Sequence, residues 1–146
     1  MEKLKLKLMR ENAILPKLAT EGSVGYDISA SISEKIIINP GETKLIHSGF
    51  ALELKRGYAA FIYARSGLGV KHGIVPANCV GVIDSDYRGE VMVGLQNHSE
   101  VAFTINPFDR IAQMVIVKCE TPEIIICQEL DETKRSDGGF GSTGRF

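Results

Sequence analysis

Short apolar stretches separated by turn-forming residues run through almost the whole chain, and this rhythm limits the possible folds more than any other feature. Residues 3–8 show it in its simplest form, because Leu4, Leu6 and Leu8 alternate with lysines and fall on one face of an extended strand. No later stretch sustains the period of about 3.6 residues that an amphipathic helix requires. The pattern therefore predicts an all-β sandwich or barrel with at most one short helix.

The expected strands follow one another at short intervals. They lie at residues 3–9, 24–30, 35–38, 43–48, 50–54, 58–63, 74–75, 81–83, 91–95, 101–105, 111–118 and 123–127. Residues 39–42 read Asn-Pro-Gly-Glu, which is the chemistry of a tight turn. The run from Ala64 to Lys71 interrupts the rhythm, and Ser66 is a candidate cap for one short helical turn there.

The composition excludes several classes of protein. The 146 residues suffice for one domain with its own core, and 44% hydrophobic with 24% charged residues is ordinary for a globular protein. The net charge is −1 and there is no basic stripe, so direct nucleic-acid binding is not expected. No apolar run approaches the roughly 20 residues of a membrane span, and residues 1–10 are too charged for a signal peptide, so we expect a soluble cytoplasmic or nuclear protein. The three cysteines lack Cys-x-x-Cys spacing, which argues against a disulfide framework or a zinc site.

Residues 81–90, with the sequence Gly-Val-Ile-Asp-Ser-Asp-Tyr-Arg-Gly-Glu, are the stretch around which the rest of the chain is organised. Apolar residues that lead into Asp84 and Gly89 predict a strand that enters a hairpin turn, with residues 91–95 as the returning strand. The backbone at such a tip has donors and acceptors that can bind the edge of a planar ligand, with an acid beside them. The alternative is an ordinary surface turn with solvated acids.

The last part of the chain has a different composition. Four glycines lie between positions 138 and 144, so residues 130–146 are expected to form a flexible tail after a β domain at residues 1–129. One interpretation is plain disorder. The other is a tail that closes on a ligand, because glycine-rich backbone can wrap a phosphate, Arg135 can pair with it, and the ring of Phe140 can stack on a base.

Five stretches together resemble the five motifs of the trimeric dUTP pyrophosphatases, or dUTPases, in their order and spacing. They are residues 24–30, 65–68, 81–90, 110–115 and 135–144. Three positions depart from the family pattern, since Ala64 stands where proline is usual and Phe108 and Ser136 stand where glycine is common. None of these departures removes a reacting group.

The resemblance implies a β jelly roll assembled as a homotrimer, with active sites shared between subunits. The implied reaction is the hydrolysis of dUTP to dUMP and pyrophosphate, which limits uracil incorporation into DNA and supplies dUMP for dTMP synthesis. Asp84 would activate a water molecule for in-line attack on the α-phosphorus, because phosphoryl transfer needs a positioned nucleophile. Tyr87 would pack against the deoxyribose and exclude a 2′-hydroxyl.

The same resemblance implies the remaining contacts. The residues that would read uracil are Asn78, Gly81, Val82, Ile83 and Met92. The residues that would bind phosphate are Arg65, Ser66, Gly67 and Gln113, joined from the tail by Arg135, Gly141, Ser142 and Thr143. Phe140 would stack over the base. Asp27 would hold water molecules of a Mg²⁺ ion carried by the phosphates, because Mg²⁺ keeps several of its waters.

Two other functions stay open at this point. A dCTP deaminase shares the implied fold but needs a glutamate base beside the nucleobase, and Glu90, after the hairpin turn, fits the dUTPase pattern instead. A trimeric nucleotide sensor without turnover would not need both Asp84 and the tail. We interpret Arg110 as a salt-bridged residue at a strand start and Asp86 as a structural acid of the hairpin.

Overall fold

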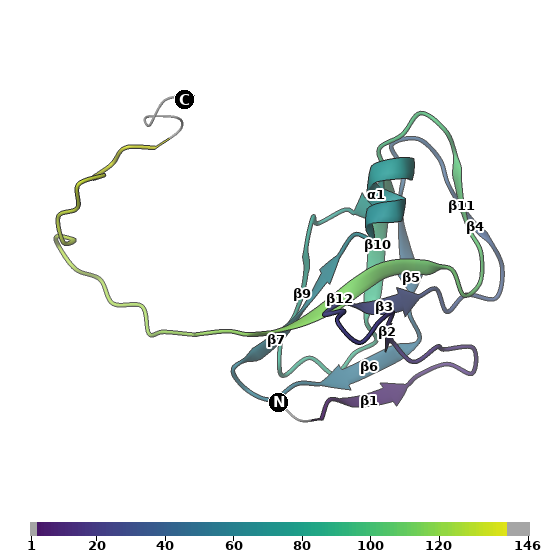
Figure 1. Ribbon diagram of the computed structural model, residues 1–146, viewed down its shortest axis with the longest axis horizontal. Helices are drawn as coiled ribbons and strands as arrows, with labels where there is room; N and C mark the ends of the chain where they lie inside the picture. Colours follow the sequence, from purple (N-terminus) through teal and green to yellow (C-terminus); the bar gives the residue numbers. More distant parts are fainter. Residues whose placement is uncertain (1–2, 140–146) are drawn as a thin grey trace.

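Twelve strands and one helix make up the regular structure of residues 3–139, which are the residues that the computed structural model describes (Figure 1). The strands are β1 (Lys5–Leu8), β2 (Lys17–Leu18), β3 (Tyr26–Ser29), β4 (Ile36–Ile38), β5 (Thr43–His47), β6 (Phe50–Glu53), β7 (Tyr58–Tyr63), β8 (Ile74–Pro76), β9 (Gly81–Ile83), β10 (Met92–Asn97), β11 (Phe103–Ile105) and β12 (Arg110–Lys118). Helix α1 spans Ser66–His72, and no helix among the described residues is long and apolar enough to cross a membrane. The predicted all-β architecture with at most one short helix is confirmed.

The strands form four small antiparallel sheets. The largest has the order β2-β3-β12-β7-β9, and a second has the order β5-β10-β8. Two further sheets pair β1 with β6 and β11 with β4. β12 is the longest strand and lies between β3 and β7 (Figure 1). It therefore joins the two strands beside which most of the predicted site residues lie.

The large sheet has one buried and one open face. Ile62 of β7 pairs with Met114 of β12, and both side chains are buried in the core. Tyr63 pairs with Gln113, the preceding residue of β12, and Gln113 also pairs with Asp27 of β3. Because neighbouring residues of a strand point to opposite faces, Asp27, Gln113 and Tyr63 share the face away from the core.

Aliphatic side chains from all four sheets fill the core. Its largest fully buried apolar members are Phe50, Ile28, Ile38, Ile46, Ile74, Leu95, Ile105, Ile111, Met114 and Val91. The buried Asn97 is accommodated because its Nδ2 donates to the carbonyls of Ile38 and Val101, at 2.9 and 2.8 Å, while its Oδ1 accepts from Ser99. A buried side-chain amide whose nitrogen and oxygen both have hydrogen-bond partners costs little free energy of desolvation. Its bonds also fix the loop that contains Ser99 and Val101.

The predicted hairpin of residues 81–95 is wrong as a pairing of strands. β9 pairs with β7, whereas β10 pairs with β5 and β8, so the two strands belong to different sheets. β10 buries Val93 and Leu95 in the core and gains a neighbour on each edge, while Val82 of β9 stays exposed. Pairing on both edges stabilises β10 more than a hairpin with the three-residue strand β9 would. Residues 84–91 therefore cross from the sheet that contains β9 to the sheet that contains β10.

Two further predictions are corrected by the structure. Residues 123–127 form no strand, since they pair with none of the described strands. Ser66 does not cap α1: the N-cap is Arg65, and no side chain of the cap makes a hydrogen bond. The expected turn at residues 39–42 is present, since Glu42 N donates to Asn39 O at 2.9 Å.

A substitution at Gly49 tests how tightly the β5–β6 connection is packed. Its φ is +77°, and a Cβ there would lie 2.5 Å from the Cβ of Ala13 and 2.6 Å from the Oγ of Ser31. We expect Gly49→Ala to lower the free energy of unfolding by about 3 kcal/mol or more, because strain and overlap add. Gly41→Ala is the matched control: its φ is +75° but no atom lies within 4 Å, so a loss of about 1 kcal/mol is expected. Urea denaturation measures both, and equal losses would contradict the packing argument.

Candidate active site

A first pocket, which we call the Asp27 pocket, brings together predicted residues from three separate motifs. It has a volume of about 430 Å³ and is lined by Ala19, Gly22, Ser23, Val24, Gly25, Asp27, Arg65, Ser66 and Gln113. β3 supplies Asp27, the start of α1 supplies Arg65 and Ser66, and β12 supplies Gln113. The pairing of β12 with both β3 and β7 is what assembles these distant stretches.

Two arginines hold the carboxylate at the centre of this pocket. Arg65 Nε donates to Asp27 Oδ1 at 2.8 Å, and Arg110 Nη1 donates to Oδ2 at 3.0 Å. Gln113 Nε2 donates to the carbonyl of Ala64 at 2.9 Å, which fixes the amide beside the start of α1. Two guanidinium groups against one carboxylate leave a net positive charge, which favours an anionic ligand. The salt bridge of Arg110 at the first residue of β12 agrees with the structural role expected for it.

A second pocket, which we call the β9–β10 fork, lies where these two strands diverge. It has a volume of about 110 Å³ and is lined by Ile62, Pro76, Asn78, Gly81, Val82, Ile83, Met92, Val93 and Gly94. All five residues expected to read uracil are among them. β9 is the last strand of its sheet, so among the described residues no strand bonds to its outer edge. Its backbone donors and acceptors are therefore available to a ligand in the fork.

The size of the fork limits what it can hold. Pockets for complete drug-sized ligands usually span roughly 300–1,000 Å³, so about 110 Å³ suits a single small ring. Gly81 keeps this space open, since a Cβ there would lie 3.1 Å from the Cβ of Ile62 and 3.6 Å from the amide nitrogen of Asn78. Ala77 N donates to Gly94 O at 2.8 Å, which ties the segment after β8 to β10 beside the fork.

Asp84 and Tyr87 lie on the loop that leaves β9. Tyr87 N donates to Asp84 O at 3.2 Å, which closes a turn, and the Tyr87 hydroxyl donates to the carbonyl of Glu90 at 3.1 Å. The Tyr87 ring covers Gly89 so closely that a Cβ there would lie 2.3 Å from the hydroxyl oxygen. Tyr87 is nevertheless 42% exposed, so one part of its ring is open to a ligand.

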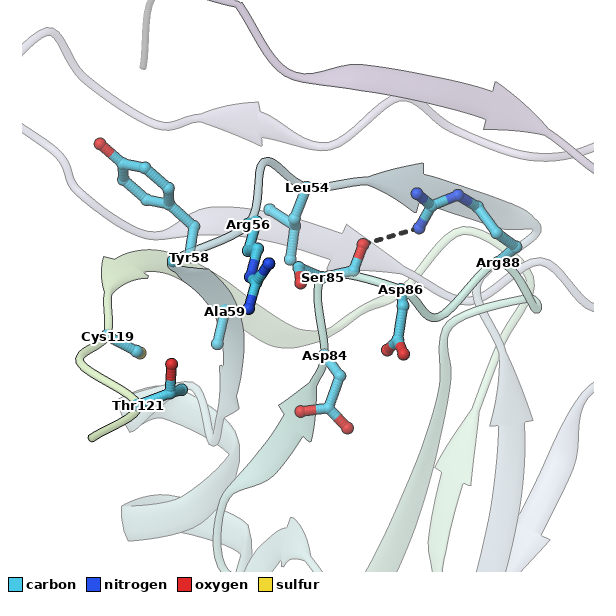
Figure 2. A pocket seen from close by; sticks show the side chains of 11 residues that line it. Leu54, Arg56, Tyr58, Ala59, Asp84, Ser85, Asp86, Arg88, Cys119 and Thr121 are labelled. Atoms are coloured by element: carbon cyan, nitrogen blue, oxygen red, sulfur yellow. Dashed lines mark hydrogen bonds between the residues drawn. The ribbon is translucent and has the colours of Figure 1, made fainter. Parts of the chain in front are cut away.

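Asp84 lines a third cavity, of about 670 Å³, between this loop and the segment that follows β6 (Figure 2). Figure 2 shows Asp84 and Asp86 on the same side of the loop, while Arg88 turns back to donate to the Ser85 carbonyl at 2.8 Å. The Asp84 carboxylate is exposed and makes no hydrogen bond to another described residue, so it is free to hold a water molecule. Asp84 is the only predicted site residue that lines this cavity. Although the cavity is large, the residues predicted to contact the base and the phosphates therefore lie elsewhere.

Glu90 ends the loop in a network that the sequence analysis missed. Its carboxylate accepts hydrogen bonds from Arg10 Nε at 3.0 Å and Gly49 N at 2.8 Å, and His47 Nδ1 lies 2.9 Å from its Oε2. Burial raises the pKa of Glu90, but these three groups together outweigh it and hold that pKa below its ordinary value. No motif signals Arg10 or His47, because they meet Glu90 only through the folding of distant segments.

The two pockets do not merge within one chain. They share no lining residue, and they lie on different faces of β7: the fork includes Ile62, on the core face, whereas Gln113 of the Asp27 pocket pairs with Tyr63. After β12 the chain runs away from the sheets (Figure 1). Arg135 lies in this segment, and its Nε donates to Gly138 O at 2.7 Å. Gly67 lies in the first turn of α1, and Phe140, Gly141, Ser142 and Thr143 lie outside the described residues.

The carboxylate of Asp27 suits a magnesium ion that arrives bound to the ligand. In residues 3–139, no three acidic, histidine or cysteine side chains lie close enough together to hold a metal ion by themselves. Mg²⁺ commonly keeps several waters and is shared with phosphates. Each oxygen of Asp27 accepts one hydrogen bond from an arginine and can accept a second, so Asp27 keeps the capacity to bind a metal-bound water.

A family model described as dUTPase matches residues 11–144, and the chain belongs to the dUTPase family. Deoxyuridine 5′-triphosphate nucleotidohydrolase of Burkholderia cenocepacia is 49% identical over 146 residues, covering 98% of this chain and 99% of that protein. The protein of the same name from Burkholderia mallei is 47% identical over the same shares of both chains.

Solved structures agree with this membership. A mutant dUTPase of Staphylococcus bacteriophage 80alpha with dUpNHpp has a TM-score of 0.91 at 27% identity and covers 99% of both chains. A mutant dUTPase from phage phi11 of S. aureus, described with a structural Mg(II) ion, has a TM-score of 0.82 at 25% identity and covers 90% of this chain and 100% of that one. The predicted family and its jelly-roll fold are thereby confirmed.

The Glu90 network generates a prediction about stability and pH. Because the pKa of Glu90 is lowered by folding, its contribution is complete above the ordinary value of 4.5 and is lost as the pH falls through the lower pKa of the folded protein. We expect Glu90→Gln to cost about 2 kcal/mol of unfolding free energy at pH 7 and progressively less in acid. Glu53→Gln, which breaks the exposed 2.9 Å pair with Lys5, is the control and should change stability far less. A cost for Glu90→Gln that does not shrink below pH 4.5 would contradict this account.

Proposed function

We propose that this chain hydrolyses dUTP to dUMP and pyrophosphate. Family membership and the relatives named above support the reaction. The observation that carries it at this site is the β9–β10 fork: five predicted base-contacting residues line one ring-sized pocket, and Asp84 directly follows β9. A base bound in the fork would therefore bring the rest of its nucleotide toward the loop that carries Asp84.

Asp84 is the proposed general base. Its exposed carboxylate, without a bond to another described residue, can orient a water molecule and accept its proton during in-line attack on the α-phosphorus. Pyrophosphate is the leaving group, and the products are dUMP and pyrophosphate. Hydrolysis by this route would limit uracil incorporation into DNA and supply dUMP for dTMP synthesis.

Selectivity is proposed to come from the fork and from Tyr87. The free edge of β9 offers peptide N–H and C=O groups that would pair with uracil, with Asn78 beside them, and the small volume of the fork would leave no room for the methyl group of thymine. The Tyr87 ring, fixed over Gly89, would pack against the deoxyribose and collide with a 2′-hydroxyl.

The triphosphate is proposed to bind in the Asp27 pocket. Arg65, Ser66 and Gly67 at the start of α1 and Gln113 of β12 would contact its oxygens, and the net positive charge of the cluster of Asp27, Arg65 and Arg110 favours it. When bound, Mg²⁺ would neutralise phosphate charge, with Asp27 holding it through a water molecule.

A complete site is proposed to need more than one copy of the chain, as a homotrimer. The fork and the Asp27 pocket lie on different faces of β7 and share no residue, which supports a site built from the fork of one subunit and the Asp27 pocket of another. The segment after β12 supports association as well: Ile124, Ile125 and Ile126 are 91%, 78% and 101% exposed, and such a row of aliphatic side chains needs a partner surface.

Residues 130–146 are proposed to act as a tail that closes over the substrate. Arg135 would pair with the terminal phosphate, Gly141, Ser142 and Thr143 would add donors, and Phe140 would stack on uracil. The segment from Cys119 to Gly139 leads away from its own sheets, which supports closure over a site on another subunit (Figure 1). Closure of this kind excludes bulk water from the reacting phosphates.

Replacing the proposed base separates an enzyme from a binding protein. Asp84→Asn keeps the size of the side chain but removes the proton acceptor, so we expect dUTP turnover to fall by several orders of magnitude while dUTP binding persists. Asp86→Asn, two residues along the same loop, is the control and should retain most activity. Pyrophosphate release and equilibrium binding measure the two quantities. Near-normal turnover by Asp84→Asn would refute the assigned base, and ammonia release from dCTP would identify a deaminase.

Removing the tail tests its proposed role. A chain truncated after Lys134 retains all twelve described strands, so we expect the same unfolding midpoint together with greatly reduced turnover of dUTP. Thermal unfolding and pyrophosphate release are the measurements. Full-rate hydrolysis by the truncated chain would show that the tail has no part in catalysis.

A further inference from the structure

We propose that Arg10 and His47 are positioning residues that set the sugar selectivity of the site by holding Glu90, and through it the ring of Tyr87. This inference rests on the proposed function, because it deepens the role given there to Tyr87. Neither Arg10 nor His47 lines the fork or the Asp27 pocket, so both would act at a distance from the substrate.

The first step concerns what fixes Tyr87. Its hydroxyl bonds to the carbonyl of Glu90 at 3.1 Å, and its ring lies against Gly89. The position of the ring therefore follows the backbone of these two residues. Because Tyr87 is 42% exposed and its hydroxyl is tied to residue 90, movement of residue 90 would move the ring.

The second step concerns what fixes Glu90. Its side chain is 14% exposed and is held by three groups: Arg10 of the loop after β1, His47 at the end of β5, and Gly49 N in the adjoining β5–β6 connection. Arg10 grips both carboxylate oxygens, with Nε 3.0 Å from Oε1 and Nη2 3.3 Å from Oε2. A guanidinium group that donates to both oxygens of a carboxylate fixes the orientation of the carboxylate as well as its distance.

The third step connects the same cluster to the other side of the fork. His47 pairs directly with Met92 across β5 and β10, and Met92 lines the fork. His47 Nδ1 lies 2.8 Å from Arg10 Nη2 and 2.9 Å from Glu90 Oε2. One ring nitrogen either accepts from the arginine or donates to the carboxylate, so each neutral tautomer still ties the imidazole into the cluster. The cluster thus sets the spacing between the Tyr87 loop and β10.

The consequence is a loss of selectivity when the cluster is broken. Rejection of a 2′-hydroxyl depends on a ring held within a fraction of an ångström, and small misplacements of positioning groups have large kinetic effects. We expect Arg10→Met, which keeps the length of the stem but removes both donors, to lower the ratio of kcat/KM for dUTP to that for UTP by about tenfold or more. Arg10→Lys, which keeps one charged donor, should restore a substantial part of the ratio.

Lys5→Met is the matched control. Lys5 is also a basic residue of the N-terminal segment and also pairs with a glutamate, Glu53, at 2.9 Å, but neither residue makes a hydrogen bond or salt bridge to residues 84–90. Its dUTP to UTP ratio should equal that of the unmodified chain. A purely structural role for Arg10 would lower stability and activity toward both nucleotides in proportion, which leaves the ratio unchanged.

A double substitution makes the test specific to Tyr87. Tyr87→Ala should itself collapse the ratio, and in that background Arg10→Met should cause no further loss, because the residue through which it acts is gone. If Tyr87→Ala collapses the ratio while Arg10→Met leaves it unchanged, the inference is wrong and the proposed function stands. If Tyr87→Ala leaves the ratio unchanged, the sugar gate and this inference both fall. Failure of the unmodified chain to hydrolyse dUTP would overturn the proposed function and the inference together.

Discussion

The divergence of β9 and β10 is the constraint on which the rest of the site depends. Each strand pairs away from the other, β9 with β7 and β10 with β5 and β8, and the chain between them must cross from one sheet to the next. The crossing leaves a ring-sized gap with an unpaired strand edge on one side, and it places the Asp84–Glu90 loop at the rim of that gap. Had the two strands paired, their hydrogen bonds would occupy the groups that a base needs, and the fork would not exist.

Two charged networks hold the loops around this frame. Asp27 draws Arg65 and Arg110 together and so joins β3, the start of α1 and β12 through one positively charged cluster. Glu90 draws Arg10, His47 and Gly49 N together and so fixes the end of the loop that carries Tyr87. In both cases one partly buried carboxylate collects donors from segments far apart in sequence. The first network positions the Asp27 pocket, and the second positions the loop at the rim of the β9–β10 fork. Each network therefore serves a different half of the proposed site.

Local patterns in the sequence were sufficient to predict most strands. Alternation located β1, and the apolar run after residues 55–57 located β7. The ligand contacts of Asp27, Ser66 and Gln113 were implied by the family resemblance and by no local pattern. Local patterns could not show that β9 prefers β7 to β10, since turn chemistry at residues 84–89 is the same in both arrangements. They also predicted a strand at residues 123–127, because three successive isoleucines favour extended structure whether or not a partner strand is present. Arg10 and His47 escaped notice because their partner is about 40 or more residues away and no motif connects them.

The central claim is that a working site combines the fork of one chain with the Asp27 pocket of another, and mixing two inactive variants tests it most directly. Asp84→Asn damages only the fork side, and Ser66→Ala combined with Gln113→Ala damages only the Asp27 pocket. If subunits associate at random in a one-to-one mixture refolded together, roughly a quarter of the sites receive both intact halves. The account therefore predicts that dUTP hydrolysis returns to about that fraction of the unmodified rate. Two variants that stay inactive after mixing, although mixed assemblies form, would show that each chain builds its own site and would contradict the account.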